Sequence, residues 1–343
     1  MNPVRAAFAD QARSCRTLGS DLTGHILDLL GRELQSDQGE VARRILGWQG
    51  DVTSRGASVP LRLAGALHGL VLDHKAPQLA AAYADRDVSA GLLLDSIAGH
   101  EERILDWLDR APQTNEVGRA ATLIAGAKFA LDQLAAPMKL AVKELGASAG
   151  LNLNFCDYGT DTGAEIIGRD DVLVTDCTWR GPHPGTQDLH SVSRRGVDLA
   201  PPDRNQPTRL RAYIWADQPQ RLARLDAALA HAGNHPPELE QGDAAAWIEK
   251  EILSQQGVLT FIYHTVAFQY FPADTQQRVN HRLEEAGGLA TRDAPLAHLS
   301  MEADDRRNGA ALTLRIWDGA DRVWDLGRAD FHGRWIDWSP MLR

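Results

Sequence analysis

The sequence lacks the apolar segments that would direct it to a membrane or out of the cell. No uninterrupted apolar run reaches the length of about 18 residues that a membrane-spanning helix requires. The first residues, MNPVRAAFADQARSC, also lack the apolar segment of a secretory signal peptide. Both absences predict a cytoplasmic protein with no membrane partner.

Cysteine is scarce, and the residue spacings of common metal sites are missing. The 3 cysteines, Cys15, Cys156 and Cys177, lie far apart and are odd in number. No C-x-x-C pair and no H-E-x-x-H segment occurs, so the sequence predicts neither a metal site nor a redox pair. We expect buried, reduced thiols.

Basic residues are outnumbered by acidic ones. The chain has 46 Asp and Glu against 36 Lys and Arg, which gives a formal net charge of −10. Nucleic acids and anionic membranes attract positively charged surfaces, so this balance argues against both as partners. We instead expect the molecule on which the protein acts, its acceptor, to be a small molecule or a protein. The sequence makes no prediction about the oligomeric state.

The two halves of the chain differ in their hydrophobic pattern. Residues 1–136 show helical spacing of apolar side chains, with one continuous helix expected over 91–110. From residue 137 onward strands alternate with helices, and the run VLTFIYH at 258–264 is typical of a central parallel strand. We predict an α/β protein with an all-helical N-terminal domain over 1–136 that acts as a lid. A Rossmann-like sheet domain over 137–343 follows, with an inserted segment near 156–190.

Small residues cluster directly after the first expected strand. Residues 138–154 read MKLAVKELGASAGLNLN, and glycine at 146 and 150 permits positive φ and close approach of a ligand. Two interpretations fit this segment. E-x-G-x-S-x-G resembles the first motif of S-adenosylmethionine-dependent methyltransferases, with Ser148 where a glycine often stands. G-A-S-A-G also matches the G-x-S-x-G nucleophile elbow of α/β-hydrolases, in which Ser148 would be the nucleophile.

Acidic residues at the next strand ends favour the methyl-donor interpretation. Asp198 ends an expected second strand, where a carboxylate can accept both ribose hydroxyls, and the inserted segment explains its distance from Gly150. Asp243 ends an expected third strand, where Rossmann-type sheets of methyltransferases hold the adenine amino group. A hydrolase would need several strands before its nucleophile and an oxyanion loop, whereas the region before residue 137 is helical. The serine hydrolase stays an alternative, as does a nucleotide-binding protein without catalysis.

The chain resembles a bacterial family, domain of unknown function 2332. The shared motifs are Q-T-N-E-V-G-R (113–119), E-L-G-A-S-A-G-L-N-L (144–153), R-R-G-V-D-L (194–199), H-T-V-A-F-Q-Y-F-P (264–272) and H-G-R-W (332–335). The resemblance covers nearly the whole chain and implies a back half similar to a Rossmann-fold, methyltransferase-type sheet. Such a sheet would bind S-adenosylmethionine as its cofactor through Glu144, Gly146, Ala147, Ser148, Gly150, Asp198 and Asp243.

Polar residues near the expected sheet edge are the catalytic candidates. His264 ends the strongest strand, where open α/β sheets place their ligands, and it could deprotonate an acceptor. Tyr270 and Glu116 are the other two catalytic candidates. Asn115, Arg119 and Gln269 are expected to contact the acceptor or to form a roof over the site. For 115–119 the alternative is helix capping, for Tyr270 packing, and for His264 a structural hydrogen bond.

Overall fold

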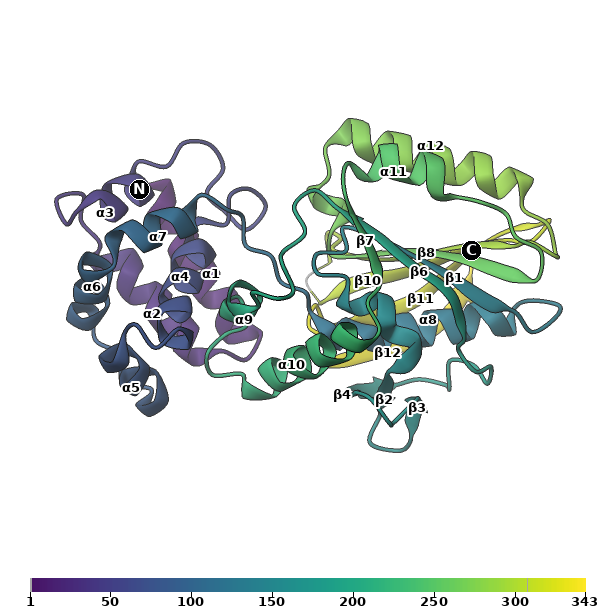
Figure 1. Ribbon diagram of the computed structural model, residues 1–343, viewed down its shortest axis with the longest axis horizontal. Coiled ribbons are helices and arrows are strands. Elements are labelled where there is room, and N and C mark those ends of the chain that lie inside the picture. The colour runs from purple at the N-terminus through teal and green to yellow at the C-terminus, as the bar shows by residue number, and fades with distance from the viewer. Residues whose placement is uncertain (1, 307) are drawn as a thin grey trace. The chain divides into compact units, whose positions relative to one another are not determined.

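The computed structural model describes residues 2–306 and 308–343 (Figure 1). The chain forms two compact units. The first comprises the chain up to Thr114 together with Pro202–Ala223, and the second comprises Asn115–Pro201 and Arg224–Arg343. The division therefore falls before residue 136, because the helix that follows Asn115 packs against the sheet of the second unit.

The described residues of the first unit form helices and connecting loops. Two helix starts follow from serine caps: Ser20 Oγ accepts the N–H of Thr23, and Ser89 Oγ accepts the N–H of Leu92. The helices are α1 (Pro3–Thr17), α2 (Asp21–Glu33), α3 (Glu40–Leu46), α4 (Val59–Leu72), α5 (Pro77–Asp85), α6 (Ala90–Gly99), α7 (Glu101–Leu108) and α9 (Thr208–Ala212).

The single helix expected over 91–110 is wrong. The segment is divided into α6 and α7 at His100, whose φ of −135° ends α6. The His100 ring bonds to the carbonyl oxygen of Ser96 through Nδ1 and to that of Lys75 through Nε2. A ring that binds carbonyl oxygens of two different segments holds this break, and the apolar periodicity does not record it.

The core of the first unit centres on α4, and α9 packs directly against it. A Cβ on Gly65 of α4 would lie 2.4 Å from the Tyr213 ring, so glycine is needed for this approach. The Tyr213 hydroxyl accepts the Trp107 Nε1–H at 3.0 Å, and His68 Nδ1 bonds to the Ala212 carbonyl oxygen at 3.2 Å. These contacts explain why 202–223, which follows the second strand of the sheet, belongs to the helical unit.

The second unit contains a nine-stranded sheet in the order β5-β12-β11-β10-β9-β8-β1-β6-β7. From β9 to β7 all neighbours are parallel, β9 to β12 form an antiparallel meander, and β5 pairs parallel with β12. The strands are β1 (Lys139–Leu145), β5 (Thr178–Arg180), β6 (Ser191–Asp198), β7 (Glu238–Gln241), β8 (Val258–Thr265), β9 (Leu296–Glu302), β10 (Ala310–Trp317), β11 (Asp321–Ala329) and β12 (Trp335–Leu342).

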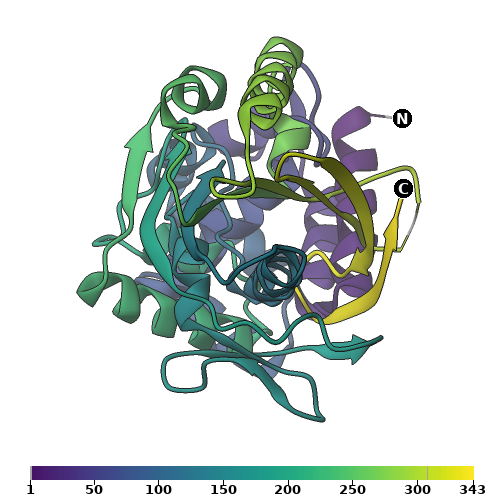
Figure 2. The ribbon, with the colours of Figure 1, turned by 90° about the vertical axis from the view of Figure 1, so that its right-hand side faces the viewer.

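Helices cover both faces of this sheet. On one face α8 (Ala120–Asp132) lies in the curve of the sheet, where Figure 2 shows it end-on, and Leu299 packs where a side chain on Gly126 would be. Every residue from 120 to 131 is buried. On the other face lie α11 (Ala244–Glu251) and α12 (Ala273–Leu289), and Trp317 packs against Gly287 of α12. Side chains of one strand therefore alternate between these two layers.

Part of the segment expected as an insertion forms a small sheet of its own, whereas β5 from the same segment joins the large sheet. β2 (Gly159–Asp161) pairs antiparallel with β3 (Ile166–Gly168) and parallel with β4 (Val174–Asp176). The buried hydroxyls of Thr160 and Thr175 bond to each other at 3.0 Å. Short 3-10 helices occur at η1 (Val117–Arg119), η2 (Leu151–Asp157) and η3 (Phe268–Tyr270), and α10 (Pro219–Asn234) runs across the division of the two units.

Candidate functional site

The turn after β1 consists of small residues with positive φ. Gly146 and Gly150 both have φ 73°, and Ser148 between them has φ 51°. The N–H groups of Gly146 and Ala147 donate to the carbonyl oxygen of Val197 at 2.9 and 3.0 Å. Glycine adopts positive φ without strain, whereas serine needs surrounding contacts that hold it there. The turn is thus bonded to the end of β6.

Asp198 supplies one of those contacts from the end of β6. Its Oδ2 accepts the N–H of Ser148 at 2.8 Å, and its Oδ1 accepts the N–H of Ala200 at 2.9 Å. The carboxylate predicted to bind a ribose therefore lies beside the predicted glycine turn and fixes its backbone. The Ser148 hydroxyl oxygen is buried and has no hydrogen-bond partner among residues 2–306 and 308–343.

The segment 115–119 lies against the same turn. The Asn115 side-chain oxygen accepts the N–H of Leu151 at 3.0 Å, which satisfies a free N–H at the start of η2. The carbonyl oxygen of Glu116 accepts from the Asn152 side-chain amide at 3.2 Å. The other amide atom, Asn152 Oδ1, is buried without a partner in the described part of the chain. The Glu116 carboxylate accepts the N–H of Gly118 at 3.0 Å and so caps η1.

Arg119 connects the end of β8 with the turn between β11 and β12. Its Nη1 donates to the carbonyl oxygen of Thr265 at 2.8 Å, and its Nε donates to that of Phe331 at 2.9 Å. Asn115 and Arg119 therefore lie at the carboxyl ends of β1 and β8, on the side of the sheet edge predicted for them. Both residues belong to the compact unit that contains the sheet.

Two glycines allow this segment to touch the H-G-R-W motif. A Cβ on Gly118 would lie 2.2 Å from the carbonyl oxygen of His332, and one on Gly333 would lie 2.1 Å from that of Gly118. Asp330 stabilises the facing turn, since its carboxylate accepts two hydrogen bonds from the Arg334 guanidinium at 2.9 and 2.7 Å. The two sequence motifs thus meet through their backbones.

Glu144 is buried on the α8 side of β1. Its Oε2 accepts the Tyr263 hydroxyl at 3.1 Å. Burial raises the pKa of Glu144 well above its ordinary value, and the charge of Asp198 adds to this effect, while the Tyr263 bond and Arg119 oppose it. Burial therefore favours the neutral form of this carboxyl group, which can donate as well as accept.

His264 lies on the opposite face of the sheet, toward α12. Its Nδ1 is 2.7 Å from Glu302 Oε1, and its ring stacks on Phe268 with centroids 4.6 Å apart. His298 lies next to it, with ring centroids 5.0 Å apart. Burial lowers the pKa of His298 well below its ordinary value, helped by the charges of His264 and Arg315. Burial therefore disfavours the protonated form of His298.

Three other predicted residues have contacts or exposure that bear on their roles. Asp243 caps α11: its Oδ1 accepts the N–H of Ala246 and its Oδ2 accepts the Thr275 hydroxyl, both at 3.0 Å. The Gln269 side-chain oxygen accepts the N–H of Ala303 at 3.2 Å. Tyr270 is 52% exposed. The structure thus assigns Asp243 to helix capping and Gln269 to a loop contact, and neither contact involves His264.

A family model described as "Uncharacterized protein conserved in bacteria (DUF2332)" matches residues 5–338. The chain belongs to this family. No curated protein and no solved structure matches it. The DUF2332 match spans both compact units and every candidate residue described above.

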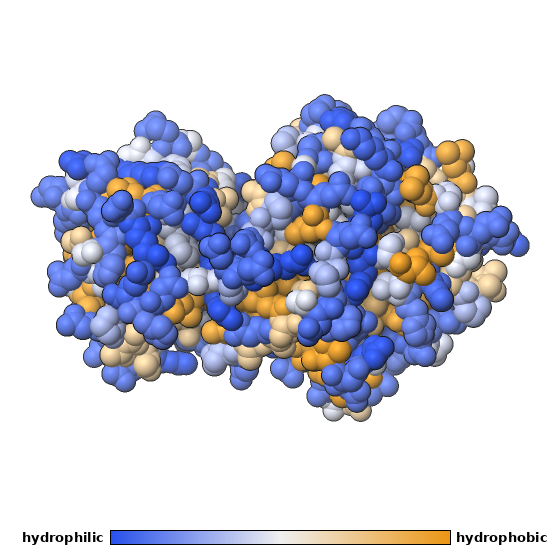
Figure 3. Space-filling model, viewed as in Figure 1, coloured by the Kyte–Doolittle hydropathy of each residue, from blue (hydrophilic) through white to orange (hydrophobic). Residues whose placement is uncertain are grey.

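The structure also bears on metals and membranes. Among residues 2–306 and 308–343, no group of three or more His, Cys, Asp or Glu side chains is arranged to hold a metal ion. The three cysteines are free and buried. No described helix is both long and apolar enough to span a bilayer. Hydrophilic residues cover most of the visible face in Figure 3, with hydrophobic ones scattered between them.

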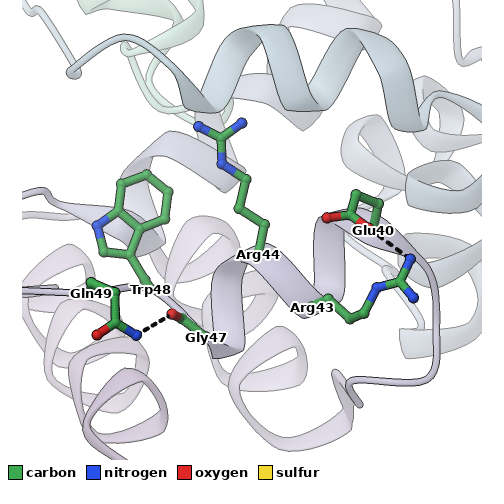
Figure 4. Close-up of a pocket in the computed structure, with 6 residues that line it drawn as sticks. All are labelled: Glu40, Arg43, Arg44, Gly47, Trp48 and Gln49. Carbon is green, nitrogen blue, oxygen red and sulfur yellow. Dashed lines mark hydrogen bonds and ion pairs between the residues drawn. The ribbon is translucent and has the colours of Figure 1, made fainter.

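A surface pocket of about 460 Å³ lies within the helical unit (Figure 4). The Arg44 guanidinium carbon is 5.6 Å from the centre of the Trp48 ring, and Arg43 pairs with Glu40 at 2.7 Å. None of the predicted site residues lines this pocket. Its lining residues are Glu40, Arg43, Arg44, Gly47, Trp48 and Gln49.

Sequence reasoning missed several polar partners of the site. Glu302, the partner of His264, ends β9 in the segment LAHLSMEA, where period-two alternation places it on the same face as His298. The period-two alternation and the position at a strand end could together have identified Glu302 from the sequence. Tyr263 and Asn152 were missed because their partners, Glu144 and Glu116, are remote in sequence and no spacing rule links them.

Proposed function

We propose that the second unit binds S-adenosylmethionine and transfers its methyl group to a small-molecule or protein acceptor. The observation that carries this proposal is the order of the parallel strands. In chain order, β7-β6-β1-β8-β9 reads third, second, first, fourth, fifth. This is the order of Rossmann-like sheets, which bind nucleotides outside the carboxyl ends of the strands where the order reverses. Here the reversal falls between β1 and β8.

The residues at that point suit a ligand with several polar groups. The turn from Gly146 to Gly150 follows β1 with positive φ at three positions, a backbone conformation that is typical of ligand-facing turns. Two buried atoms beside it, Ser148 Oγ and Asn152 Oδ1, have no hydrogen-bond partner among the described residues. Buried polar atoms are normally paired, and a bound ligand would pair these two. Gly146, Ser148 and Asn152 would therefore hold the cofactor, with Asp198 beside them.

One part of the sequence-based assignment is weakened by the geometry. An adenine amino group would need an acceptor at the end of β7, but both Asp243 oxygens already accept hydrogen bonds within the protein. β10 follows β9 directly in the chain and pairs antiparallel with it, so the parallel part of the sheet ends at β9. The proposal accordingly rests on β1, β6 and β8, and it assigns no essential contact to Asp243.

When bound, S-adenosylmethionine would supply an electrophilic methyl group. The chain would then need to orient the acceptor and take up its proton. His264 suits the second task because its Nδ1 is engaged by Glu302, which leaves Nε2 as the basic atom. Glu116 caps η1 and Tyr270 is largely exposed, so His264 is the preferred base of the three candidates.

Titration calorimetry of the full chain with S-adenosylmethionine and with its demethylated product tests the proposal. We expect binding of both and at least a tenfold weaker affinity in Asp198→Asn, because the turn at Ser148 loses its charged acceptor. Asp170→Asn, at an exposed position, is the matched control and should bind as the wild type does. No heat for either nucleotide would overturn the proposal. Binding without any methylated product in cell extract would overturn the transfer step and favour a non-catalytic protein.

A serine hydrolase is the second candidate, and the positive φ of Ser148 favours it. Nucleophile elbows hold their serine in such a strained strand-to-helix turn. However, no described residue bonds to the Ser148 hydroxyl, so no base activates it. If a fluorophosphonate probe labels wild type but not Ser148→Ala, the hydrolase is correct. If Ser148→Ala retains nucleotide binding and wild type stays unlabelled, the methyltransferase is favoured.

A further inference from the structure

Glu302 collects hydrogen bonds from His264 and from the turn that follows β8. Its Oε1 accepts from His264 Nδ1 at 2.7 Å, from the N–H of Ala267 at 3.1 Å and from the N–H of Phe268 at 3.0 Å. The Gln269 N–H lies 3.5 Å from Oε2. Only 15% of the Glu302 side chain is exposed. A single carboxylate at the end of β9 thus binds both the His264 side chain on β8 and the turn that follows β8.

The turn that Glu302 holds is strained. Val266 has φ 50°, a conformation that β-branched residues rarely adopt and that costs roughly 1–2 kcal/mol. Its N–H donates to the Met301 carbonyl oxygen at 2.7 Å. Such strain persists when neighbouring contacts over-determine the backbone. The contacts here come from two adjacent residues of β9, Met301 and Glu302.

This turn also packs against the glycine turn after β1. The Ala267 methyl group occupies the space beside Gly146, since a Cβ on Gly146 would lie 2.6 Å from Ala267 Cβ. Phe271 closes the same side, with ring atoms at 3.5 Å from that point. A displacement of residues 266–268 would therefore alter the surroundings of the β1 turn. Through Ala267, the contacts of Glu302 therefore extend to the turn after β1.

The ionisation of Glu302 fixes the direction of its hydrogen bond with His264. Burial alone would raise the pKa of Glu302, but the His264 bond, its charge and the N–H groups of Ala267 and Phe268 together hold that pKa below its ordinary value. An ionised carboxylate only accepts. His264 must therefore donate from Nδ1 whenever it is neutral. His298, with its lowered pKa, and Arg315 are the other titratable or charged groups that influence this face.

We propose that Glu302 is a positioning residue that fixes His264 in the Nδ1–H tautomer and clamps the 266–268 turn against Gly146. The unprotonated Nε2 is then the atom that receives a proton from the acceptor. The use of Nε2 in catalysis rests on the proposed methyltransferase function. The tautomer and the clamped turn do not, so they can be tested without any ligand.

Long-range proton–nitrogen NMR of the histidine rings in the full chain tests the tautomer. We expect neutral wild-type His264 to carry its proton on Nδ1. Glu302→Gln keeps an acceptor oxygen and should retain that tautomer, whereas Glu302→Leu removes it and should shift the proton to Nε2. Ser300→Ala, on the same strand face, is the matched control and should leave the ring unchanged.

Amide hydrogen exchange supplies the second readout. We expect the N–H groups of Ala267 and Phe268 to exchange at least ten times faster in Glu302→Leu than in wild type, and near the wild-type rate in Ser300→Ala. Should Glu302→Leu fail to fold, the wild-type spectrum alone decides, because an Nε2–H tautomer in it overturns the proposal. Unchanged tautomer and exchange in folded Glu302→Leu would also overturn it. Absence of nucleotide binding would overturn the proposed function and leave both measurements valid.

Discussion

Replacing Gly333 by alanine tests the backbone contact between segments 117–119 and 331–335. Gly333 has φ 76°, and an added Cβ would lie 2.1 Å from the carbonyl oxygen of Gly118 and 2.4 Å from its carbonyl carbon. Both neighbours are backbone atoms, so no change of rotamer relieves the overlap. Gly319, in the turn between β10 and β11, has φ 91° and no atom within 4 Å of an added Cβ. Gly319→Ala is therefore the matched control.

The two variants share the cost of positive φ and differ in crowding. An L-residue at positive φ costs roughly 1–2 kcal/mol, and forced overlap in a packed region costs about 1–3 kcal/mol more. We expect the free energy of unfolding to fall by about 1 kcal/mol in Gly319→Ala and by about 3 kcal/mol in Gly333→Ala. In a unit of about 200 residues, the difference corresponds to a Tm lower by roughly 4–8 °C.

Differential scanning calorimetry of the full chain measures this difference. The transition of the sheet unit should move to lower temperature in Gly333→Ala. The added methyl group must displace the turn that contains residues 331–335, which weakens the hydrogen bonds of Arg119 to Phe331 and Thr265. Equal Tm shifts in Gly333→Ala and Gly319→Ala would refute the close approach of the two segments.

Two further predictions concern buried titratable groups. The pKa of Glu144 is raised well above 4.5 in the folded protein, so wild type should lose stability relative to Glu144→Gln as the pH rises above 4.5. Parallel curves of denaturation midpoint against pH would contradict this. Burial raises the pKa of Cys15 and Cys177 to about 12, so the native thiols should react with iodoacetamide roughly 100-fold more slowly than in urea-unfolded protein. Rapid labelling of either native thiol would contradict its burial.

Local sequence patterns predicted the parts of the fold that depend on short-range regularity. The apolar runs that became β1 and β8, and the glycine turn between 146 and 150, are recognisable because strand burial and positive φ select particular residues. The strand end at Asp198 follows in the same way, whereas the third parallel strand ends at Gln241, two residues before the expected Asp243. These features position the candidate site.

The features that were missed depend on contacts between distant segments. Residues 202–223 join the helical unit because Tyr213 packs against Gly65 and bonds to Trp107, and no local pattern encodes that partnership. The pairing of β5 with β12 brings together short segments more than 150 residues apart in sequence, such as Arg180 and Asp337, whose ion pair spans the two strands. Glu302 was missed for the same reason, since its role depends on where β9 lies beside β8.

The two turns at the strand-order reversal are fixed by groups that come from neighbouring strands. Asp198 at the end of β6 holds Ser148 at positive φ, and Glu302 at the end of β9 holds the turn that contains Val266. Each turn with a strained residue therefore has a charged acceptor one strand away, and neither contact requires a ligand. Binding to a preformed turn avoids the entropy cost of ordering a loop. For the proposed nucleotide site we therefore expect affinity to depend on Asp198 and Glu302 through backbone geometry, even if the ligand contacts neither carboxylate.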